Sequence, residues 1–367
     1  MARRGAYGTV LALLLCALAL AGCSQLSLGA LRSGVIQPSI TPSATESGTE
    51  TVGREFTFEQ ATIRLDVPVD RSVYAGAVGA RKSAIFLGGK EPPNWVAGYY
   101  RAFVDEKHQT AFYDALAGAL HQVRDQEGLD SSRYVELVTS MAQNLEYRTD
   151  TGNLAPKVPI ETFGDGFGDC DDKALLAAGI LARDGYDVAI LMFSPEKHVA
   201  LGVRAPGLDY KGTGYAYVEM TEPSLVGIPA EELAGGTKLT SQPEVIKIGS
   251  GTGAYEAADQ IQYIQQRLAE IEAERAQLKT QIDSETTELK KLDASLQAGR
   301  QSLQSITDRS AYISAVDRFN REIRDYNDRV AAMGKLIDRY NLLVEAQRFA
   351  AENQTARPQV YERLRAL

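Results

Sequence analysis

Residues 164–185 decide the fold, and they read GDGFGDCDDKALLAAGILARDG. A glycine-rich segment leads to Cys170, and residues 173–183 are strong helix formers throughout. Gly185 stands where the C-terminal cap of a helix belongs. The pattern predicts a helix that carries Cys170 in its first turn.

Three carboxylates surround this cysteine in the sequence. Asp169 is the predicted N-cap, and Asp171 and Asp172 lie at the positive end of the helix dipole. The amide groups of that end stabilise a thiolate over a thiol, whereas the neighbouring acids oppose thiolate formation. Two interpretations of Cys170 follow, a nucleophile or a small structural cysteine at a helix start, and we favour the nucleophile.

The other two cysteines belong to the N-terminus. Cys16 lies in an apolar segment, and Cys23 ends the sequence LAGC at residues 20–23, which is typical of a lipoprotein cleavage site. With the segment removed and Cys23 acylated, Cys170 is the only unmodified thiol. An intramolecular disulfide is then excluded in a compartment that usually favours disulfides.

Export is predicted by the first 22 residues. Arg3 and Arg4 precede an apolar run at residues 10–21 that is short for a membrane span of about 20 residues. We expect a signal peptide at residues 1–22, with an uncleaved anchor helix as the alternative. Residues 23–53, rich in Ser, Thr, Gly and Pro, are expected to be a flexible lipidated linker. The predicted location is extracytoplasmic, on the cell membrane or on the outer membrane of a diderm bacterium.

Three apolar segments follow the predicted cysteine helix. Residues 187–193 have the length of a buried strand, and residues 198–203 and 214–221 are separated by a turn-rich segment. The last two therefore predict an antiparallel hairpin.

The hairpin brings two polar residues together. If Val203 pairs with Gly214, then His198 stands directly opposite Glu219. Opposed side chains of an antiparallel pair lie about 5 Å apart on one face. Glu219 is thus placed to orient one imidazole nitrogen while the other faces a nucleophile.

The order of a cysteine at a helix start, a histidine on a strand and an acid on the next strand resembles the transglutaminase-like superfamily, a papain-related cysteine enzyme core. The resemblance covers about residues 133–229 and includes the segments YRTD (147–150), PIETF (159–163), GYDV (185–188) and HVALGV (198–203). It implies an α+β fold in which the helix-start cysteine packs on an antiparallel sheet. It also implies that Cys170 is the nucleophile, His198 the base and Glu219 the third member, where the wider family more often has Asp.

The resemblance also bears on metals. In a related group of bacterial periplasmic peptidases, the acids that flank the cysteine bind calcium, and Asp169 and Asp171 match those positions. A plain capping role is the alternative. The implied acyl-transfer reaction itself requires no cofactor.

The predicted globular domain spans residues 54–253, with helices at residues 109–126 and at residues 131–145, the second capped by Ser131. The 367 residues, 44% of them hydrophobic, suffice for one such core plus an extension. The net charge of −9 argues against nucleic acid as a partner.

The last third of the chain has a different periodicity. Two series of apolar residues at a spacing of three and four run from Ile261 to Ile306 and from Tyr312 to Val344. Their phase slips at residues 305–310, so residues 254–353 predict an antiparallel coiled-coil hairpin with arms of about 60 to 75 Å. Residues 354–367 are a predicted tail. The globular core is expected to need nothing from this arm, which is either a spacer or an arm that binds a partner or dimerises.

Together these features predict a membrane-anchored extracytoplasmic cysteine hydrolase, a peptidase or amidase with a Cys-His-Glu triad that acts on a protein or peptide. Protein cross-linking is less favoured because water is always present and no amine-donor site is evident. The alternative is a non-catalytic surface adaptor whose domain binds peptide and whose coiled coil binds a partner.

Overall fold

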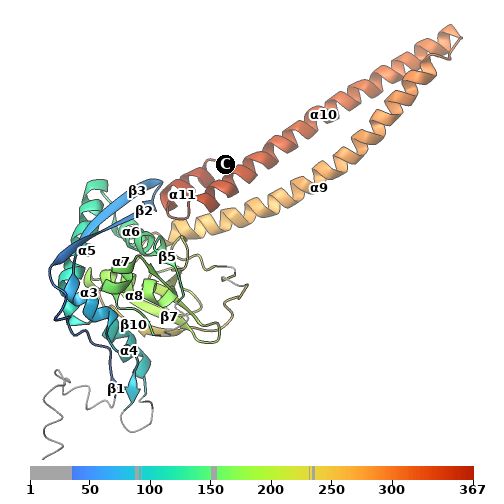
Figure 1. Cartoon of the computed structure of the whole chain (residues 1–367). Helices are drawn as coiled ribbons and strands as arrows, with labels where there is room; N and C mark the ends of the chain where they lie inside the picture. The colour runs from blue at the N-terminus through green and yellow to red at the C-terminus, as the bar shows by residue number, and fades with distance from the viewer. Residues whose placement is uncertain (1–34, 87–90, 92, 150–154, 231, 234–235) are drawn as a thin grey trace, which may run out of the picture.

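The computed structural model describes residues 35–86, 91, 93–149, 155–230, 232–233 and 236–367. The predicted signal peptide, Cys16 and Cys23 lie outside these residues. The fold is mixed α/β, with a globular part from which two long helices project (Figure 1). No helix in the described ranges has the length and apolarity that crossing a bilayer requires.

A four-stranded antiparallel sheet forms the centre of the globular part. Its order is β10-β7-β8-β9, made of Glu244–Lys247, Val188–Phe193, His198–Arg204 and Tyr215–Val218. Strands β7, β8 and β9 are almost wholly buried. Their near-continuous apolar character follows, because both faces of the sheet are covered.

The pairing of β8 with β9 corrects the predicted register. Val203 lies opposite Ala216, where the sequence predicted Gly214. Gly214 has a φ of +82°, a left-handed conformation that belongs to the turn before β9. The slip is two residues, so every side chain keeps its predicted face, and Glu219 still points to the same side as His198.

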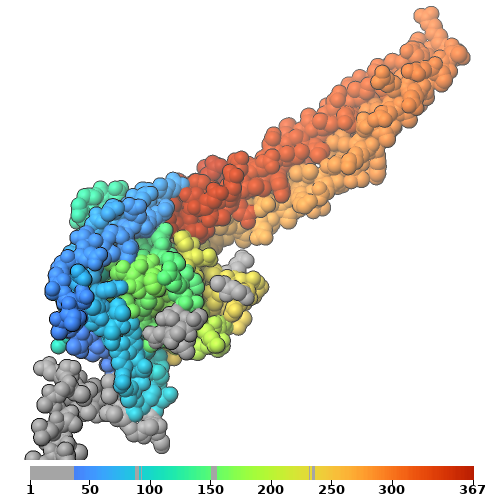
Figure 2. Space-filling model, in the orientation of Figure 1, coloured from blue at the N-terminus to red at the C-terminus, as the bar shows by residue number. Residues whose placement is uncertain are grey.

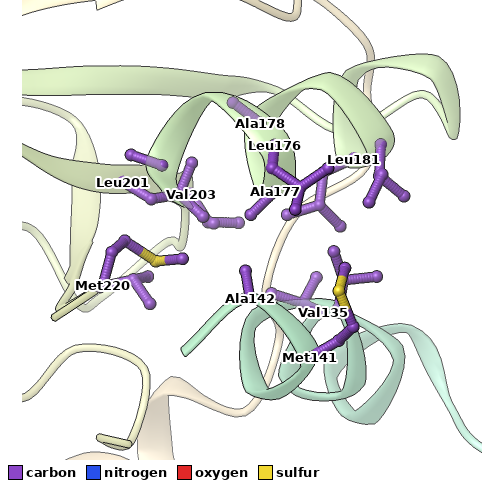
Figure 3. Close-up of a cluster of buried hydrophobic side chains, with 14 of the residues drawn as sticks. Val135, Met141, Ala142, Leu176, Ala177, Ala178, Leu181, Leu201, Val203 and Met220 are labelled. Carbon is purple, nitrogen blue, oxygen red and sulfur yellow. The ribbon is translucent and has the colours of Figure 1, made fainter. Parts of the chain in front are cut away.

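Helix α8 (Cys170–Arg183) lies against β8 and β7. Figure 3 shows Leu176 and Leu181 of α8 directed at Met141 of α6 (Ser131–Gln143), with Leu201 of β8 beside them. The predicted helix and its Asp169 cap are confirmed, since the Asp169 carboxylate accepts from the Asp172 N–H.

The cap of α6 was wrongly predicted. Asp130, one residue before the predicted Ser131, accepts the hydrogen bond from the Arg133 N–H. Ser131 Oγ instead lies 3.0 Å from the Tyr186 hydroxyl. Asp130 fits because its backbone is extended, which is the usual conformation of an N-cap.

The N-terminal boundary also moves. Strand β2 (Thr49–Phe58) pairs with β3 (Ala61–Asp70) in a separate ribbon, and Ile40 is buried in the core. The predicted linker therefore ends well before residue 53.

The remaining helices and strands of the globular part precede α8 in the chain. They are β1 Val35–Ile36, α3 Arg71–Val78, β4 Ile85–Phe86, α4 Trp95–Val104, η1 Lys107–Gln109, α5 Thr110–Glu127, β5 Glu146–Tyr147, α7 Pro159–Asp165 and β6 Phe167–Gly168.

The two long helices are α9 (Ala258–Leu303) and α10 (Arg309–Glu352), and they pack together. Arg329 pairs with Glu285 at 2.6 Å and Arg339 pairs with Glu274 at 2.7 Å, so the helices run antiparallel. The 46 residues of α9 span about 69 Å. The predicted hairpin is confirmed.

The predicted tail and the predicted independence of the arm are wrong. Residues Arg357–Arg365 form a further helix, α11, which packs on α9. Buried side chains from α11 and from the base of the hairpin belong to the same core as the sheet, among them Val360, Leu364, Ile261 and Leu343. Figure 2 shows the C-terminal segment in contact with the β2–β3 ribbon. At this contact the Glu59 N–H donates to the Thr355 carbonyl.

A buried ion pair fixes this junction. Arg357 Nε lies 2.5 Å from Glu136 Oε1 of α6, and the Tyr255 hydroxyl donates to the same oxygen. Arg357, Glu136 and Tyr255 are all buried. Because an uncompensated buried charge is strongly unfavourable, the C-terminus is part of the folded domain.

We therefore expect Arg357→Ala to lower the free energy of unfolding by about 3 to 5 kcal/mol, measured by urea denaturation. Arg329→Ala, which breaks the more exposed pair with Glu285, should cost about 1 kcal/mol or less. Equal costs for the two variants would show that α11 is not part of the core.

Candidate functional site

Cys170 is the first residue of α8 and is half-buried. The start of α8 meets the start of β8, so that the backbone N–H of Val199 faces the sulfur. Val199 directly follows His198. The fold thus brings the predicted nucleophile and the predicted base, 28 residues apart in sequence, to one corner of the sheet.

His198 and Glu219 are in direct contact. Nε2 of His198 lies 3.3 Å from Oε2 of Glu219, and both side chains are buried. The other oxygen of Glu219 accepts from the Met220 N–H at 2.9 Å, from the Thr221 N–H at 2.9 Å and from the Thr221 hydroxyl at 2.7 Å. The carboxylate is held rigidly with one oxygen directed at the imidazole.

Tyr217 is a site residue that the sequence reasoning missed. Its hydroxyl donates to Oε2 of Glu219 and lies 3.1 Å from Nε2 of His198. The signal that would find it is the period of two along a strand, which places residue 217 on the same face as residue 219.

A second missed group lies beneath the site. Lys173 is fully buried, and its ammonium donates to the carbonyls of Gln143 at 2.9 Å and of Leu145 at 3.0 Å. The Gln143 side chain in turn donates to the Glu219 carbonyl at 2.8 Å. Lys173 and Gln143 thereby tie α8 and α6 to the end of β9. The sequence signal that could have identified Lys173 is a lysine one helical turn after Cys170, on a face of the helix that is otherwise apolar.

The pKa values of the two buried charged groups, Glu219 and Lys173, are both lowered, for different reasons. Burial acts to raise the pKa of Glu219, but hydrogen bonding and the charge of His198, together with the Tyr217 hydroxyl, outweigh it and lower that pKa to about 2. Glu219 is therefore a carboxylate throughout the physiological range. Burial of Lys173 lowers its pKa to about 8.

Of the two opposing effects predicted for the Cys170 thiol, the one that disfavours the thiolate is the larger. Burial raises the pKa of Cys170, and the negative charges of Asp171 and Asp169 raise it further, whereas the Val199 N–H lowers it. The effect predicted for the helix dipole is outweighed. The raised pKa favours the thiol form of Cys170 over the thiolate.

Glu219 and Tyr217 both contact Nε2 of His198, so Nδ1 is the ring nitrogen that these two residues leave unoccupied. Among the hydrogen bonds of the described residues, none joins Cys170 Sγ to the imidazole. Catalytic hydrogen bonds are often long in the absence of substrate and tighten when substrate binds.

Asp169, Asp171 and Asp172 form a cluster whose ligand atoms all lie within 4.8 Å of one another. Both oxygens of Asp172 accept from backbone amides, those of Lys157 at 2.6 Å and of Asp169 at 3.1 Å. Asp169 caps α8, and the Tyr100 hydroxyl lies 3.4 Å from Asp171. The carboxylate oxygens of the cluster are the donor type that calcium binds. Several of these oxygens already accept hydrogen bonds from backbone amides, including those of Asp169 and Asp172 at the start of α8.

The chain matches no family model, no curated protein and no solved structure.

The low pKa of Glu219 predicts a pH-dependent stability. Its pKa falls from 4.5 to about 2 on folding, so its contribution is present above about pH 4.5 and is lost as the pH falls through 2. We expect the difference in unfolding free energy between wild type and Glu219→Gln to shrink by about 3 kcal/mol from pH 5 to pH 2, measured by urea denaturation.

Glu222→Gln, which removes an exposed carboxylate three residues away, is the matched control, and its difference from wild type should change little. A constant difference for Glu219→Gln would show that the carboxylate is not stabilised by its buried partners.

Proposed function

We propose that this protein is a transglutaminase-like cysteine hydrolase, a peptidase or amidase with Cys170, His198 and Glu219 as its triad. The observation that carries the proposal is the buried His198–Glu219 contact of 3.3 Å at the corner where α8 begins with Cys170. A nucleophile, a base and a group that orients the base are the parts that covalent acyl transfer needs.

The proposed reaction begins when Nδ1 of His198 takes the Cys170 proton as the sulfur attacks an amide carbonyl. The carbon–sulfur bond forms, and the oxyanion is stabilised by backbone N–H groups near the start of α8. The imidazolium then gives its proton to the leaving amine, which departs and leaves a thioester. Water, deprotonated by His198, adds to the thioester and releases a carboxylic acid and the thiol.

We propose hydrolysis rather than cross-linking, with a protein or peptide as substrate. The thiol that is protonated at rest makes His198 a true general base, and Glu219 stabilises the imidazolium that forms. A calcium ion, where present, would be held by Asp169 and Asp171 and would offset their negative charge. No step of the reaction passes through it.

The proposed location is extracytoplasmic, with the protein anchored to the membrane through lipid on Cys23. Because the folded domain already includes Ile40, the tether would be shorter than the sequence predicted. The hairpin has polar outer faces and a length of about 69 Å, and it would then extend from a domain held near the membrane. We propose that it is a partner-binding arm.

The first test is labelling of Cys170 with a peptidyl electrophile, read by mass spectrometry of the full chain in detergent. We expect His198→Ala to reduce the rate of labelling at Cys170 by about 10²-fold or more, because the thiol loses its base. His121→Ala is the matched control, since His121 contacts Asp184 at 3.0 Å away from the triad and should leave the rate unchanged. Equal labelling of all three proteins would favour the adaptor alternative.

The second test is hydrolysis of a peptide library by purified protein. Cys170→Ala and His198→Ala should each abolish turnover, and Glu219→Gln should retain it at a level about 10²- to 10⁴-fold lower. The double variant should be little worse than either alanine variant, because the triad acts as a unit. Normal turnover by Cys170→Ala would place any chemistry elsewhere.

A further inference from the structure

Three polar groups meet in a closed triangle behind the imidazole. The Tyr217 hydroxyl lies 3.1 Å from His198 Nε2, Glu219 Oε2 lies 3.3 Å from the same nitrogen, and Tyr217 and Glu219 are hydrogen-bonded to each other. The shorter of the two contacts to histidine is therefore the one from tyrosine. All three side chains are buried.

The number of hydrogens in this triangle fixes their positions. A carboxylate only accepts, and a tyrosine hydroxyl has one hydrogen to donate. If Tyr217 donates to Glu219, its oxygen is left as an acceptor. Two acceptors, Tyr217 Oη and Glu219 Oε2, then face Nε2, so the hydrogen of the neutral imidazole must reside on Nε2.

We propose that Tyr217 is a positioning residue which, together with Glu219, holds His198 in the Nε2–H tautomer and so leaves the lone pair on Nδ1, the nitrogen that the proposed function assigns as the base. The tautomer follows from the geometry alone. Its catalytic consequence rests on the proposed function, since only a hydrolase needs Nδ1 as a base.

The surroundings of Tyr217 support this role. Its ring packs against Phe193 at 6.1 Å and against Tyr210 at 5.2 Å between centroids, in a buried cluster on one face of the sheet. The ring is thereby held in one orientation. Burial and the neighbouring Glu219 charge raise the pKa of Tyr217 well above its usual range, so the hydroxyl keeps its hydrogen and remains a donor.

The role also accounts for the glutamate. Glu219 is one methylene longer than the Asp that the resemblance implies, and its Oε2 reaches Nε2 only at 3.3 Å. The Tyr217 hydroxyl, held between the two groups, supplies the closer acceptor. Sequence position supports the same conclusion, because residues 217 and 219 share a face two residues apart.

The test is nitrogen-15 NMR of the full chain labelled at histidine, at a pH where the imidazoles are neutral. The chain has three histidines, and the signals that are missing from the spectrum of His198→Ala are those of His198. In wild type we expect His198 to be almost wholly the Nε2–H tautomer. Tyr217→Phe should lower the ratio of Nε2–H to Nδ1–H by about 3- to 10-fold, the value of one lost hydrogen bond.

Tyr210→Phe is the matched control. It removes a hydroxyl from the ring that stacks on Tyr217, and it should leave the His198 tautomer unchanged. Thermal unfolding monitored by circular dichroism verifies that each variant is folded. A wild-type His198 in the Nδ1–H form, or a Tyr217→Phe spectrum identical to that of wild type, would overturn the proposal.

Activity separates this proposal from the proposed function. On a substrate that wild type hydrolyses, Tyr217→Phe should lower kcat by about 3- to 10-fold with KM unchanged, because the imidazolium that forms in the reaction loses one of its two acceptors at Nε2. A tautomer shift in a protein without hydrolase activity would uphold the role of Tyr217 and refute the hydrolase. A lowered kcat without a tautomer shift would refute the role of Tyr217 alone.

Discussion

A carboxylate without access to water must be surrounded by donors, and the arrangement around Glu219 follows from that constraint. Each of its oxygens is engaged, one by the backbone and hydroxyl at residues 220–221 and the other by Tyr217 and His198. Replacing the side chain of Tyr217, Thr221 or His198 by an apolar group would leave this buried charge with one partner fewer. The end of β9 is therefore fixed in shape, and the imidazole is fixed with it.

The same logic extends one layer further into the core. The ammonium of Lys173 is buried beside the site and donates to carbonyls at the end of α6, while Gln143 of that helix donates to the Glu219 carbonyl. Hydrogen-bonded buried polar groups specify a unique packing because a shifted arrangement leaves them unsatisfied. The helix that carries Cys170 and the end of β9, which Glu219 directly follows, are thus held in one relation by polar contacts as well as by the apolar core.

The long hairpin is not a separate module attached to this domain. Its base and the C-terminal helix α11 contribute to the core, and Arg357 pairs with Glu136 across 221 residues of sequence. Beyond the base, the hairpin is held by its own seam and by pairs such as Arg329 with Glu285.

Local sequence determined a large part of this protein. Helix formers after Asp169, a short apolar run that begins at His198 and heptads after Ile261 depend on near neighbours in the chain, and each produced the predicted element. The sequence also determined which side chains of the β8–β9 hairpin share a face, because the face depends only on odd or even position, and a slip of two residues preserves it.

Only the tertiary structure decided the rest. The register of β8 with β9 depended on the backbone of Gly214 in a turn. Tyr217 became a partner of His198 because their side chains lie close together in space. The pKa of the Cys170 thiol depended on its burial and on the direction of two carboxylates. The pairing of Arg357 with Glu136 could not be read from either segment, since a buried charge selects its partner by proximity in space, which sequence patterns of short period do not encode.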